Sequence, residues 1–271
     1  MDKIKTICPA KINLYLKVLD KRADGYHNIE TSFQLIDLSD KMSFELSKDN
    51  ISISSNERFL CGKNNTIYRS VLKIKKMFNI DNGVKININK KIPIGAGLGG
   101  GSSNAASTIV ALNNLWNLNL DEKELIDIGK AIGADVPLFI YGKNSIGRGI
   151  GEKLKFADSI QDNLLIIQPD IHNSTKKMFE ALDKSKKENN FFSNSIQNDF
   201  WNVFIKNNKD ISYFYNKNSK DYKLNLTGTG SCMYIRYNNE EELNKILKKI
   251  PANWRFFFCK PLQYSPICYI K

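Results

Sequence analysis

Residues 93–103 read Pro93-Ile-Gly-Ala-Gly-Leu-Gly-Gly-Gly-Ser-Ser103, and this glycine-rich stretch decides how the rest of the chain is interpreted. Val84–Lys90 before it alternates polar and apolar residues like a strand, whereas Ser103–Trp116 after it carries small residues and an apolar stripe like a helix. Glycines let the backbone turn sharply and approach a ligand closely. The start of a helix offers unpaired N–H groups that attract phosphate, and Ser102 and Ser103 add hydroxyls that can bind phosphate oxygens or magnesium. The stretch therefore predicts a phosphate-binding loop.

Better-known phosphate loops do not account for this stretch. Gly95, Gly97 and Gly100 satisfy the dinucleotide pattern G-x-G-x-x-G, and Asp121 follows at about the spacing of a ribose-binding acid. Asp121, however, begins a helix with Glu124 at the capping-box position, whereas the ribose-binding acid should end a second strand. A Walker A loop needs a lysine followed by Ser or Thr after its last glycine, and the H-R-D and D-F-G triplets of protein kinases are also absent. The loop binds phosphate by another scheme.

The composition describes a globular protein with an excess of positive charge. The 271 residues carry a formal net charge of +12, mostly from lysines interspersed with asparagines, as in residues 184–190. Sequence-specific nucleic-acid readers usually concentrate arginine, so we expect a solvated lysine surface and no nucleic-acid partner. A basic nucleic-acid-binding domain remains the alternative from another class. No apolar run approaches the roughly 20 residues that span a bilayer, so no membrane partner is expected.

Cysteine and histidine usage indicates the compartment. The five cysteines form no C-x-x-C pair, and only two histidines are present. Reduced thiols explain this better than disulfides or a zinc site. The first residues lead straight into a strand pattern with no signal peptide, so a cytoplasmic location is expected.

Periodicity along the chain favours an α+β fold. Ile12, Leu14, Leu16 and Val18 point to one side of a first strand, and Lys11, Asn13, Tyr15 and Lys17 to the other. Further strands are expected at 31–38, 42–46, 51–54, 84–90, 164–168 and 256–259, and on both sides of a turn at 227–231. Helices are expected at 66–78, 103–116, 121–133, 175–183, 196–205 and 240–249, with a loop at 184–194. We expect a β-rich and helical N-terminal domain (1–155) and a smaller α+β C-terminal domain (156–271), with a seam near 153–161.

The glycine loop together with Asn104-Ala105-Ala106 resembles the central motif of the GHMP kinases, which include galactose, homoserine, mevalonate and phosphomevalonate kinases. The resemblance extends over most of the chain and narrows to the members that act on a cytidine-diphosphate-linked methylerythritol. The motifs that carry it are Pro9–Leu16, Asp24-Gly25-Tyr26-His27, Phe33-Gln34-x-x-Asp37-Leu38, Gly133–Phe139, Gly149-Ile150-Gly151-Glu152 and Leu226–Ser231. Their shared order and spacing are more specific than any one of them.

The resemblance implies an ATP-dependent kinase that phosphorylates the 2-hydroxyl of that substrate in the non-mevalonate route to isoprenoids. It assigns Asp135 as the base and Lys11 as the cation beside it. The nucleotide-binding residues that it implies are Asn65, Pro93, Ile94, Gly95, Ala96, Gly97, Leu98, Gly99, Gly100, Gly101, Ser102 and Ser103. The substrate-binding residues are Asn13, Tyr26, His27, Thr175 and Phe179, and the supporting loop is Thr227, Gly228, Thr229 and Gly230.

ATP is the co-substrate that the resemblance implies, and Mg²⁺ is expected because it neutralises triphosphate charge. No metal ligand can be assigned from the sequence. A monomer or a weak homodimer is expected. The nearest alternative is another GHMP kinase that acts on a different alcohol, and Lys11, Asn13, Tyr26 and His27 argue against it because they match the cytidyl-specific pattern.

Overall fold

The computed structural model describes residues 3–188 and 197–269, and its mixed helices and sheets confirm the α+β prediction. The strands are β1 (Lys3–Lys21), β2 (His27–Ser47), β3 (Ile51–Ser55), β4 (Gly83–Asn89), β5 (Ser145–Arg148), β6 (Lys153–Phe156), β7 (Asn163–Gln168), β8 (Asn225–Leu226), β9 (Met233–Tyr237), β10 (Arg255–Cys259) and β11 (Pro261–Leu262). The helices are α1 (Thr66–Phe78), α2 (Gly100–Leu115), α3 (Glu122–Lys130), α4 (Val136–Tyr141), α5 (Thr175–Lys187), α6 (Trp201–Asn207), α7 (Lys209–Asn218) and α8 (Glu240–Leu247). Two short 3-10 helices lie at Arg58–Cys61 and Pro266–Tyr269.

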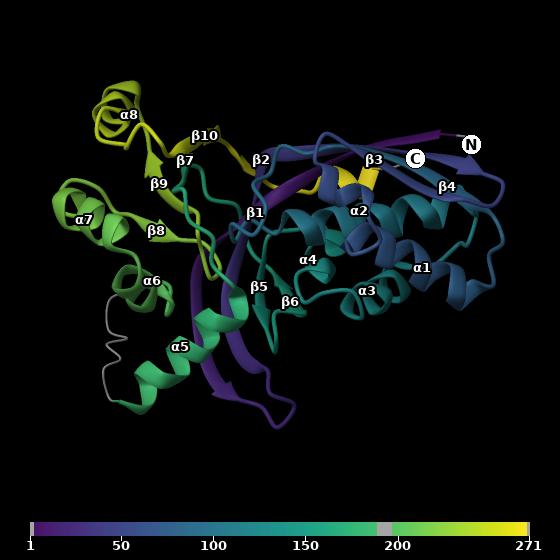
Figure 1. The fold of residues 1–271 in the computed structure, drawn as a ribbon, viewed down its shortest axis with the longest axis horizontal. Coiled ribbons are helices and arrows are strands. Elements are labelled where there is room, and N and C mark those ends of the chain that lie inside the picture. Colours follow the sequence, from purple (N-terminus) through teal and green to yellow (C-terminus); the bar gives the residue numbers. More distant parts are fainter. Residues whose placement is uncertain (1–2, 189–196, 270–271) are drawn as a thin grey trace.

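Within the described ranges the strands form two sheets. The first has the order β3-β4-β2-β5-β6, with β1 and β11 also paired to β2, and the second has the order β10-β7-β9-β8. All of these strand pairs are antiparallel except β3–β4. Figure 1 shows α1–α4 with the first sheet in one half of the molecule and α5–α8 with the second sheet in the other.

The hairpin of β1 and β2 connects the two halves. Its register runs from Lys3 opposite Glu45 to Lys21 opposite His27, and its tip reaches down beside α5 in Figure 1. Buried residues from the end of β1, Leu16 and Val18, join the hydrophobic core of the second half. One hairpin therefore carries residues of the first motif into contact with both halves.

The proposed domains, 1–155 and 156–271, divide the chain at one point, but the last residues of the chain return to the first half of the molecule. After β10, the chain returns to the first sheet, where Pro261 and Leu262 pair with Ile36 and Leu35. Ile267 is fully buried in the core of the first half. We keep the two-domain division as a proposal, with the C-terminal segment packed on the N-terminal domain.

Several element boundaries differ from the predictions. The strands expected at 31–38 and 42–46 are one strand, β2, and helices α4 and α7 were not predicted. The sequence predicted a loop that begins at Lys184. This start was wrong, because α5 continues to Lys187. Helix α6 begins at Trp201, later than the predicted start at 196. Residues 189–194 of the predicted loop and residue 196 lie outside the described residues. The capping box at Asp121 is confirmed by both of its hydrogen bonds.

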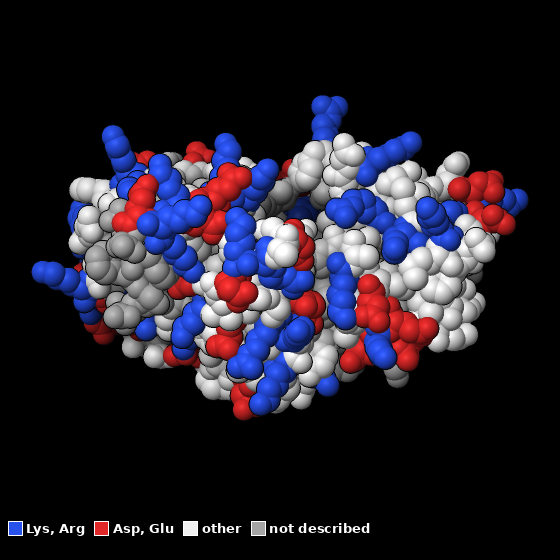
Figure 2. All heavy atoms as spheres, turned by 90° about the horizontal axis from the view of Figure 1, so that it is seen from below, with Lys and Arg blue, Asp and Glu red and all other residues white. Residues whose placement is uncertain are grey.

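Surface charge is mixed on the face seen in Figure 2. Lysine and arginine side chains are distributed over both halves of this face, with acidic side chains among them. In the part of the chain that the structure describes, no helix has the length and apolar character needed to cross a membrane.

A buried carboxylate, that of Asp40, lies in β2 between the two strands that the sequence predicted. Asp40 is fully buried, and its oxygens accept hydrogen bonds from Lys90 Nζ at 2.5 Å and from Asn104 Nδ2 at 2.9 Å. The backbone amides of Lys91 and Ile92 also donate to it, at 2.7 and 2.9 Å. Burial lowers the pKa of Lys90, and the negative charge of Asp40 opposes that shift. Asp40 thus fixes both the entry to the glycine loop and the helix that follows it.

Replacing Asp40 with alanine should strongly destabilise the protein, because it leaves the Lys90 ammonium buried without its counter-charge. We expect the free energy of unfolding to fall by about 3–5 kcal/mol, measured by urea denaturation. Asp127→Ala is the matched control, since Asp127 pairs with Lys130 at the surface and exposed pairs contribute little. Equal, small effects of both substitutions would contradict this account of Asp40.

Candidate functional site

The glycine loop turns into α2 earlier than the sequence indicated. Gly95, Gly97 and Gly99 have φ angles of +64°, +79° and +71°, which L-residues with side chains rarely adopt. Helix α2 begins at Gly100, so the start predicted at Ser103 was wrong. The amide of Ser103 donates to Gly99 O at 2.9 Å, so it is not free for a ligand. The unpaired amides at the head of α2 are therefore those of residues 100–102.

A close approach of two backbone segments shapes the loop. A Cβ on Gly97 would lie 2.2 Å from the carbonyl oxygen of Thr227. The Gly97 carbonyl accepts hydrogen bonds from Lys11 Nζ at 3.0 Å and from Thr227 Oγ1 at 3.1 Å. The turn predicted as a supporting loop thus lies directly against the glycine loop.

One cavity follows the glycine loop and the start of α1. It has a volume of about 350 Å³. Its lining residues are Phe59, Leu60, Asn64, Asn65, Thr66, Ile67, Lys90, Pro93, Ile94, Gly95, Ala96, Gly97, Leu98, Gly99, Gly100, Gly101, Ser102 and Asn104. All but one of the predicted nucleotide-binding residues lie here. The exception is Ser103, which is fully buried and whose Oγ has no hydrogen-bond partner among the described residues.

Asn65 lines this cavity, but its side chain makes most of its hydrogen bonds to other residues of the protein. Its Oδ1 accepts from the amide of Tyr68 at 2.8 Å, which caps α1. Its Nδ2 donates to the carbonyls of Leu60 and Gly62 at 2.9 and 2.6 Å. The predicted contact with a nucleobase stays a prediction, and the observed role of Asn65 is to hold the segment that carries Phe59.

A second cavity, of about 290 Å³, lies on the other side of the loop. Its lining residues are Lys11, Asn13, Leu16, Ile29, Phe33, Gly97, Gly99, Ser102, Ala134, Asp135, Ile150, Thr175, Phe179, Phe200, Gly228 and Thr229. Gly97, Gly99 and Ser102 line both cavities. A group bound at the head of α2 can therefore face a molecule in the second cavity across these three residues.

Lys11 and Asp135 meet at this shared wall. Lys11 Nζ lies 3.5 Å from Asp135 Oδ2, and the two side chains are 4% and 31% exposed. Asp135 occupies the N-cap position of α4 but makes no side-chain capping bond. Capping is the usual role of an aspartate at this position, so its partly exposed carboxylate is left available to the cavity.

Asn13 makes more hydrogen bonds within the protein than a substrate-binding role requires. Its Oδ1 accepts from Lys11 Nζ at 2.8 Å and from the amide of Gly228 at 2.9 Å, and its Nδ2 donates to Thr31 Oγ1 at 2.8 Å. Strand alternation places Lys11 and Asn13 on the side of β1 opposite Ile12 and Leu14, and both are also buried, at 3% and 2% exposed. The glycine loop and the turn at Thr227 cover that side as well. Only one N–H of Asn13 is left for a substrate.

The residues predicted to face a cytidine lie at different depths. Thr175 and Phe179 line the second cavity with Lys11 and Asp135, and Thr175 Oγ1 lies 3.2 Å from Thr229 Oγ1. His27 does not line that cavity. Its ring stacks on Phe179 with centroids 4.8 Å apart.

Tyr26 lies beside His27 in the hairpin turn and is 61% exposed. It does not line the second cavity either, so its contact with a base stays a prediction.

Some residues at the site were missed from the sequence. Phe59 and Lys90 line the nucleotide-side cavity, and the ring of His172 lies against Gly95, where a Cβ would be 2.5 Å from its Cε1. Lys90 directly precedes the loop, which is a signal that could have been used. Phe59 and His172 reach the loop only through tertiary contacts and carry no local signal. Gly230, also predicted for the supporting loop, lies beside Phe204 in the C-terminal half.

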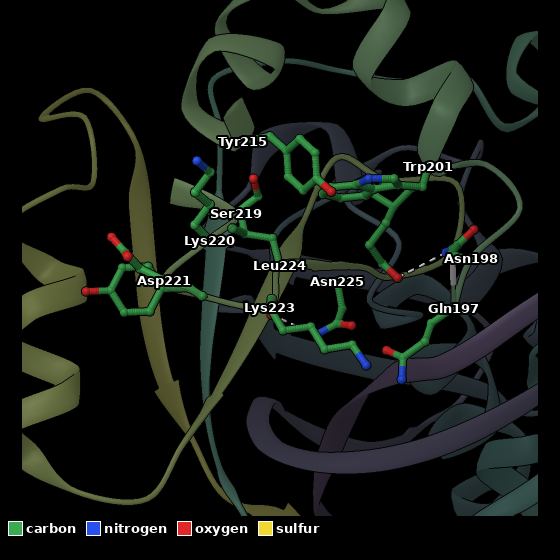
Figure 3. A pocket seen from close by; sticks show the side chains of 12 residues that line it. Gln197, Asn198, Trp201, Tyr215, Ser219, Lys220, Asp221, Lys223, Leu224 and Asn225 are labelled. Atoms are coloured by element: carbon green, nitrogen blue, oxygen red, sulfur yellow. Dashed lines mark hydrogen bonds between the residues drawn. The ribbon is translucent and has the colours of Figure 1, made fainter. Parts of the chain in front are cut away.

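A further cavity lies within the C-terminal half. It is lined by residues that include Trp201, Tyr215, Lys220, Lys223 and Asn225 (Figure 3). None of the predicted site residues lies in its lining, so it is separate from the arrangement around Lys11.

Comparison with known proteins agrees with this geometry. The family described as GHMP kinases N terminal domain matches residues 65–143. The chain is 40% identical over 263 residues to the 4-diphosphocytidyl-2-C-methyl-D-erythritol kinase of Francisella tularensis subsp. holarctica (strain OSU18), covering 94% of this chain and 95% of the relative. It is 33% identical over 266 residues to the enzyme of the same name from Pasteurella multocida (strain Pm70), covering 96% and 90%.

Solved structures share the fold. The crystal structure of a 4-(cytidine 5'-diphospho)-2C-methyl-D-erythritol kinase matches with a TM-score of 0.74 and 24% identity, covering 95% of this chain and 98% of that one. The mevalonate kinase of Methanococcus jannaschii matches with a TM-score of 0.69 and 21% identity, covering 96% and 98%. At these identities the likeness establishes the fold alone.

Fold and site together define a kinase of the GHMP class, which phosphorylates an alcohol group on a small molecule and uses ATP as co-substrate. The glycine loop lies between the two cavities, as such a transfer requires. At the identities and coverage found, the chain belongs to the 4-diphosphocytidyl-2-C-methyl-D-erythritol kinase family.

Substituting Gly97 should test the close approach to Thr227. Gly97→Ala forces a side chain into a left-handed backbone conformation and against a carbonyl oxygen, so the free energy of unfolding should fall by about 1–3 kcal/mol. Gly101→Ala is the matched variant, because a Cβ there meets nothing nearer than Thr66 Oγ1 at 3.7 Å. Its stability should stay the same or rise slightly. Calorimetric unfolding of both variants gives the comparison, and a stable Gly97→Ala protein would disprove the contact.

Proposed function

We propose that this chain transfers the γ-phosphoryl group of ATP to the 2-hydroxyl of 4-diphosphocytidyl-2-C-methyl-D-erythritol, giving the 2-phosphate and ADP in non-mevalonate isoprenoid biosynthesis. The observation that carries the proposal is the wall shared by the two cavities. Gly97, Gly99 and Ser102 belong to both, and the Lys11–Asp135 pair lies beside them. The names of the curated relatives supply the identity of the alcohol.

The triphosphate would bind at the head of α2. The free amides of residues 100–102 and the positive end of the helix favour its negative charge. Ser102 adds a hydroxyl that lines both cavities. Direct phosphoryl transfer depends mostly on positioning and charge stabilisation, and these groups would place the terminal phosphate at the shared wall.

Asp135 would receive the proton of the acceptor hydroxyl. Its carboxylate is partly exposed in the second cavity and has Lys11 Nζ at 3.5 Å. An ionised carboxylate can only accept hydrogen bonds, and it is the form that takes up a proton. Lys11 also lies close enough to the shared wall to stabilise negative charge on the transferred group.

Mg²⁺ fits this arrangement as a companion of the triphosphate. Among residues 3–188 and 197–269, no group of three or more His, Cys, Asp or Glu side chains could hold a metal ion. Mg²⁺ is usually held by one or two carboxylates together with substrate phosphates, and Ser102, which lines both cavities, is the candidate ligand from this chain. When bound, it would neutralise triphosphate charge.

The cytidine end of the substrate would extend along α5. Thr175 and Phe179 line the second cavity from this helix, and His27 lies behind Phe179. We therefore assign Phe179, His27 and the exposed Tyr26 to the base. A cytoplasmic location and a monomer or weak homodimer belong to the same proposal. Free thiols at Cys8, Cys61, Cys232 and Cys259 are consistent with a reducing compartment.

The choice of alcohol can be tested directly with ADP release coupled to NADH oxidation. Purified protein should turn over 4-diphosphocytidyl-2-C-methyl-D-erythritol with kcat/KM at least about 10³-fold above mevalonate, homoserine and galactose, because a site built to pair with the base leaves polar groups unpaired with the others. Preferred turnover of one of the other alcohols would assign the chain to a different reaction.

The role of the carboxylate predicts a specific kinetic change. Asp135→Asn should lower kcat by about 10²-fold or more with little change in the KM for ATP, because the amide cannot accept the hydroxyl proton. Stability should change little, since Asp135 makes no capping bond.

Lys11→Met is the informative companion variant. It should lower both kcat and the unfolding temperature, because Lys11 also bonds to Asn13 and Gly97. Near-normal turnover of folded Asp135→Asn would exclude Asp135 as the proton acceptor.

A further inference from the structure

The cavity shown in Figure 3 takes no part in the proposed function. It has a volume of about 320 Å³ and lies between α6, the end of α7 and the segment that leads into β8. Its floor is buried, because Trp201, Leu224 and Leu226 are 4%, 7% and 1% exposed. A preformed concave site of this volume is the usual setting for a small-molecule ligand.

Aromatic rings form one side of this cavity. Trp201 and Tyr215 pack edge to face, with their ring centroids 5.1 Å apart. Figure 3 shows these rings opposite the side chains of Lys223 and Gln197. Aromatic side chains offer a large apolar surface, so this side can cover a compact apolar group of a ligand.

The charged side chains of the lining leave an excess of positive charge. Lys220 and Lys223 line the cavity, and within the described part of the chain neither ammonium has an ion-pair partner. The acidic residue of the lining, Asp221, is already paired with Lys249 at 2.6 Å. Two uncompensated ammoniums at the edge of an apolar cavity favour a doubly negative ligand.

Polar donors lie on the same side as one of these ammoniums. Figure 3 shows the Lys223 side chain reaching toward the carboxamide of Gln197, and Ser219 adds a hydroxyl from the end of α7. Ammonium, carboxamide N–H and hydroxyl groups all donate hydrogen bonds. This side of the cavity is therefore suited to anionic oxygens, whereas the opposite side is suited to an apolar group.

The inner end of the cavity contacts the supporting loop. Asn198 lines the cavity, and its Nδ2 donates to the carbonyls of Leu226 and Gly228 at 3.0 and 2.9 Å. Leu226 lines the cavity as well and directly precedes Thr227. A ligand in contact with Asn198 and Leu226 therefore acts on the turn that packs against Gly97.

Hydrogen bonds continue from that turn to the glycine loop. The amide of Gly228 donates to Asn13 Oδ1 at 2.9 Å, and Thr227 Oγ1 donates to the Gly97 carbonyl at 3.1 Å. Asn13 Oδ1 also accepts from Lys11 Nζ at 2.8 Å. A ligand that binds more tightly when the turn holds this arrangement stabilises the glycine loop in the same arrangement.

We propose that this cavity is a regulatory site for a small organic phosphate, with its apolar group against Trp201 and Leu224 and its phosphate at Lys223, and that occupancy strengthens ATP binding through Asn198 and the supporting loop. A phosphate dianion matches the two uncompensated ammoniums, whereas a carboxylate matches only one. The site shares no lining residue with the two cavities beside the glycine loop. The inference does not depend on which alcohol the kinase phosphorylates.

Phenyl phosphate is a probe with the expected charge and a compact apolar group, and titration calorimetry measures its binding. Inorganic phosphate and benzyl alcohol, which each carry one half of the probe, should bind at least about tenfold more weakly, because one loses the apolar contact and the other the charge. Benzoate should bind with intermediate affinity. Absence of saturable binding of phenyl phosphate to the wild-type protein would overturn the proposal.

Variants of the lining locate the probe. Lys223→Gln should weaken its binding at least about tenfold, as expected for loss of a hydrogen bond to a charged group. Ser219→Phe should abolish binding by filling the cavity from its rim. Lys206→Gln is the matched control, because Lys206 is exposed on α6 and lies outside the lining. Equal losses in Lys206→Gln and Lys223→Gln would mean that only net charge matters, which would refute the site.

The coupling to the nucleotide is measured with AMP-PNP, a non-hydrolysable ATP analogue. Saturating phenyl phosphate should lower the Kd of AMP-PNP about fivefold, and saturating AMP-PNP should lower the Kd of phenyl phosphate by the same factor, because coupling between two sites is reciprocal. Competition between the two ligands would place the probe in the nucleotide site and sink the inference. An unchanged Kd would overturn the coupling.

Asn198→Ala tests the route of the coupling. It removes the bonds to the carbonyls of Leu226 and Gly228, so the coupling factor should fall to about one while phenyl phosphate still binds. Asn198→Asp, which keeps the size but loses the donor, should behave in the same way, and thermal unfolding shows whether each variant is folded. Full coupling in either folded variant would exclude Asn198 as the connection.

Discussion

The ammonium of Lys11 is the group on which the arrangement of the site depends. It is almost completely buried, and it is held by Asn13 Oδ1 at 2.8 Å, by the carbonyl of Gly97 at 3.0 Å and by Asp135 at 3.5 Å. A buried charge is tolerated only where it is paired and hydrogen-bonded. Satisfying this one charge therefore requires β1, the glycine loop and the start of α4 to converge, and that convergence places the carboxylate beside the loop.

The same requirement explains why the C-terminal half belongs to the site. Asn13 binds Lys11 with one oxygen, and that oxygen also accepts from the amide of Gly228 at 2.9 Å. A Cβ on Gly97 would lie 2.2 Å from the carbonyl oxygen of Thr227, and a Cβ on Gly228 would lie 3.2 Å from the Cα of Gly97, so the two turns pack backbone against backbone. Backbone contacts of this kind leave little freedom, so the glycine-loop end of the site is fixed by main-chain geometry in both halves.

Local signals in the sequence were read correctly where local interactions decide the structure. The capping box at Asp121 and helix α1 depend on neighbouring residues, and both form as predicted. The alternation of β1 placed Lys11 and Asn13 on one face, and both line the same cavity, but the pattern did not reveal that distant segments bury them. The start of α2 was placed too late because glycines are poor helix formers. Residues 100–102 are helical because packing and the Asp40–Asn104 bond hold that turn.

The end of the site at the hairpin tip was the part least accessible from the sequence. His27 Nε2 lies 2.7 Å from Asp183 Oδ1, but the two residues are separated by 156 positions, and an aspartate in a lysine-rich helix gives no local signal of a partner. The helical spacing of Thr175, Phe179 and Asp183 acquires meaning only once the hairpin tip is known to lie against α5. This end is built from side chains, whereas the end at the glycine loop is built largely from backbone contacts.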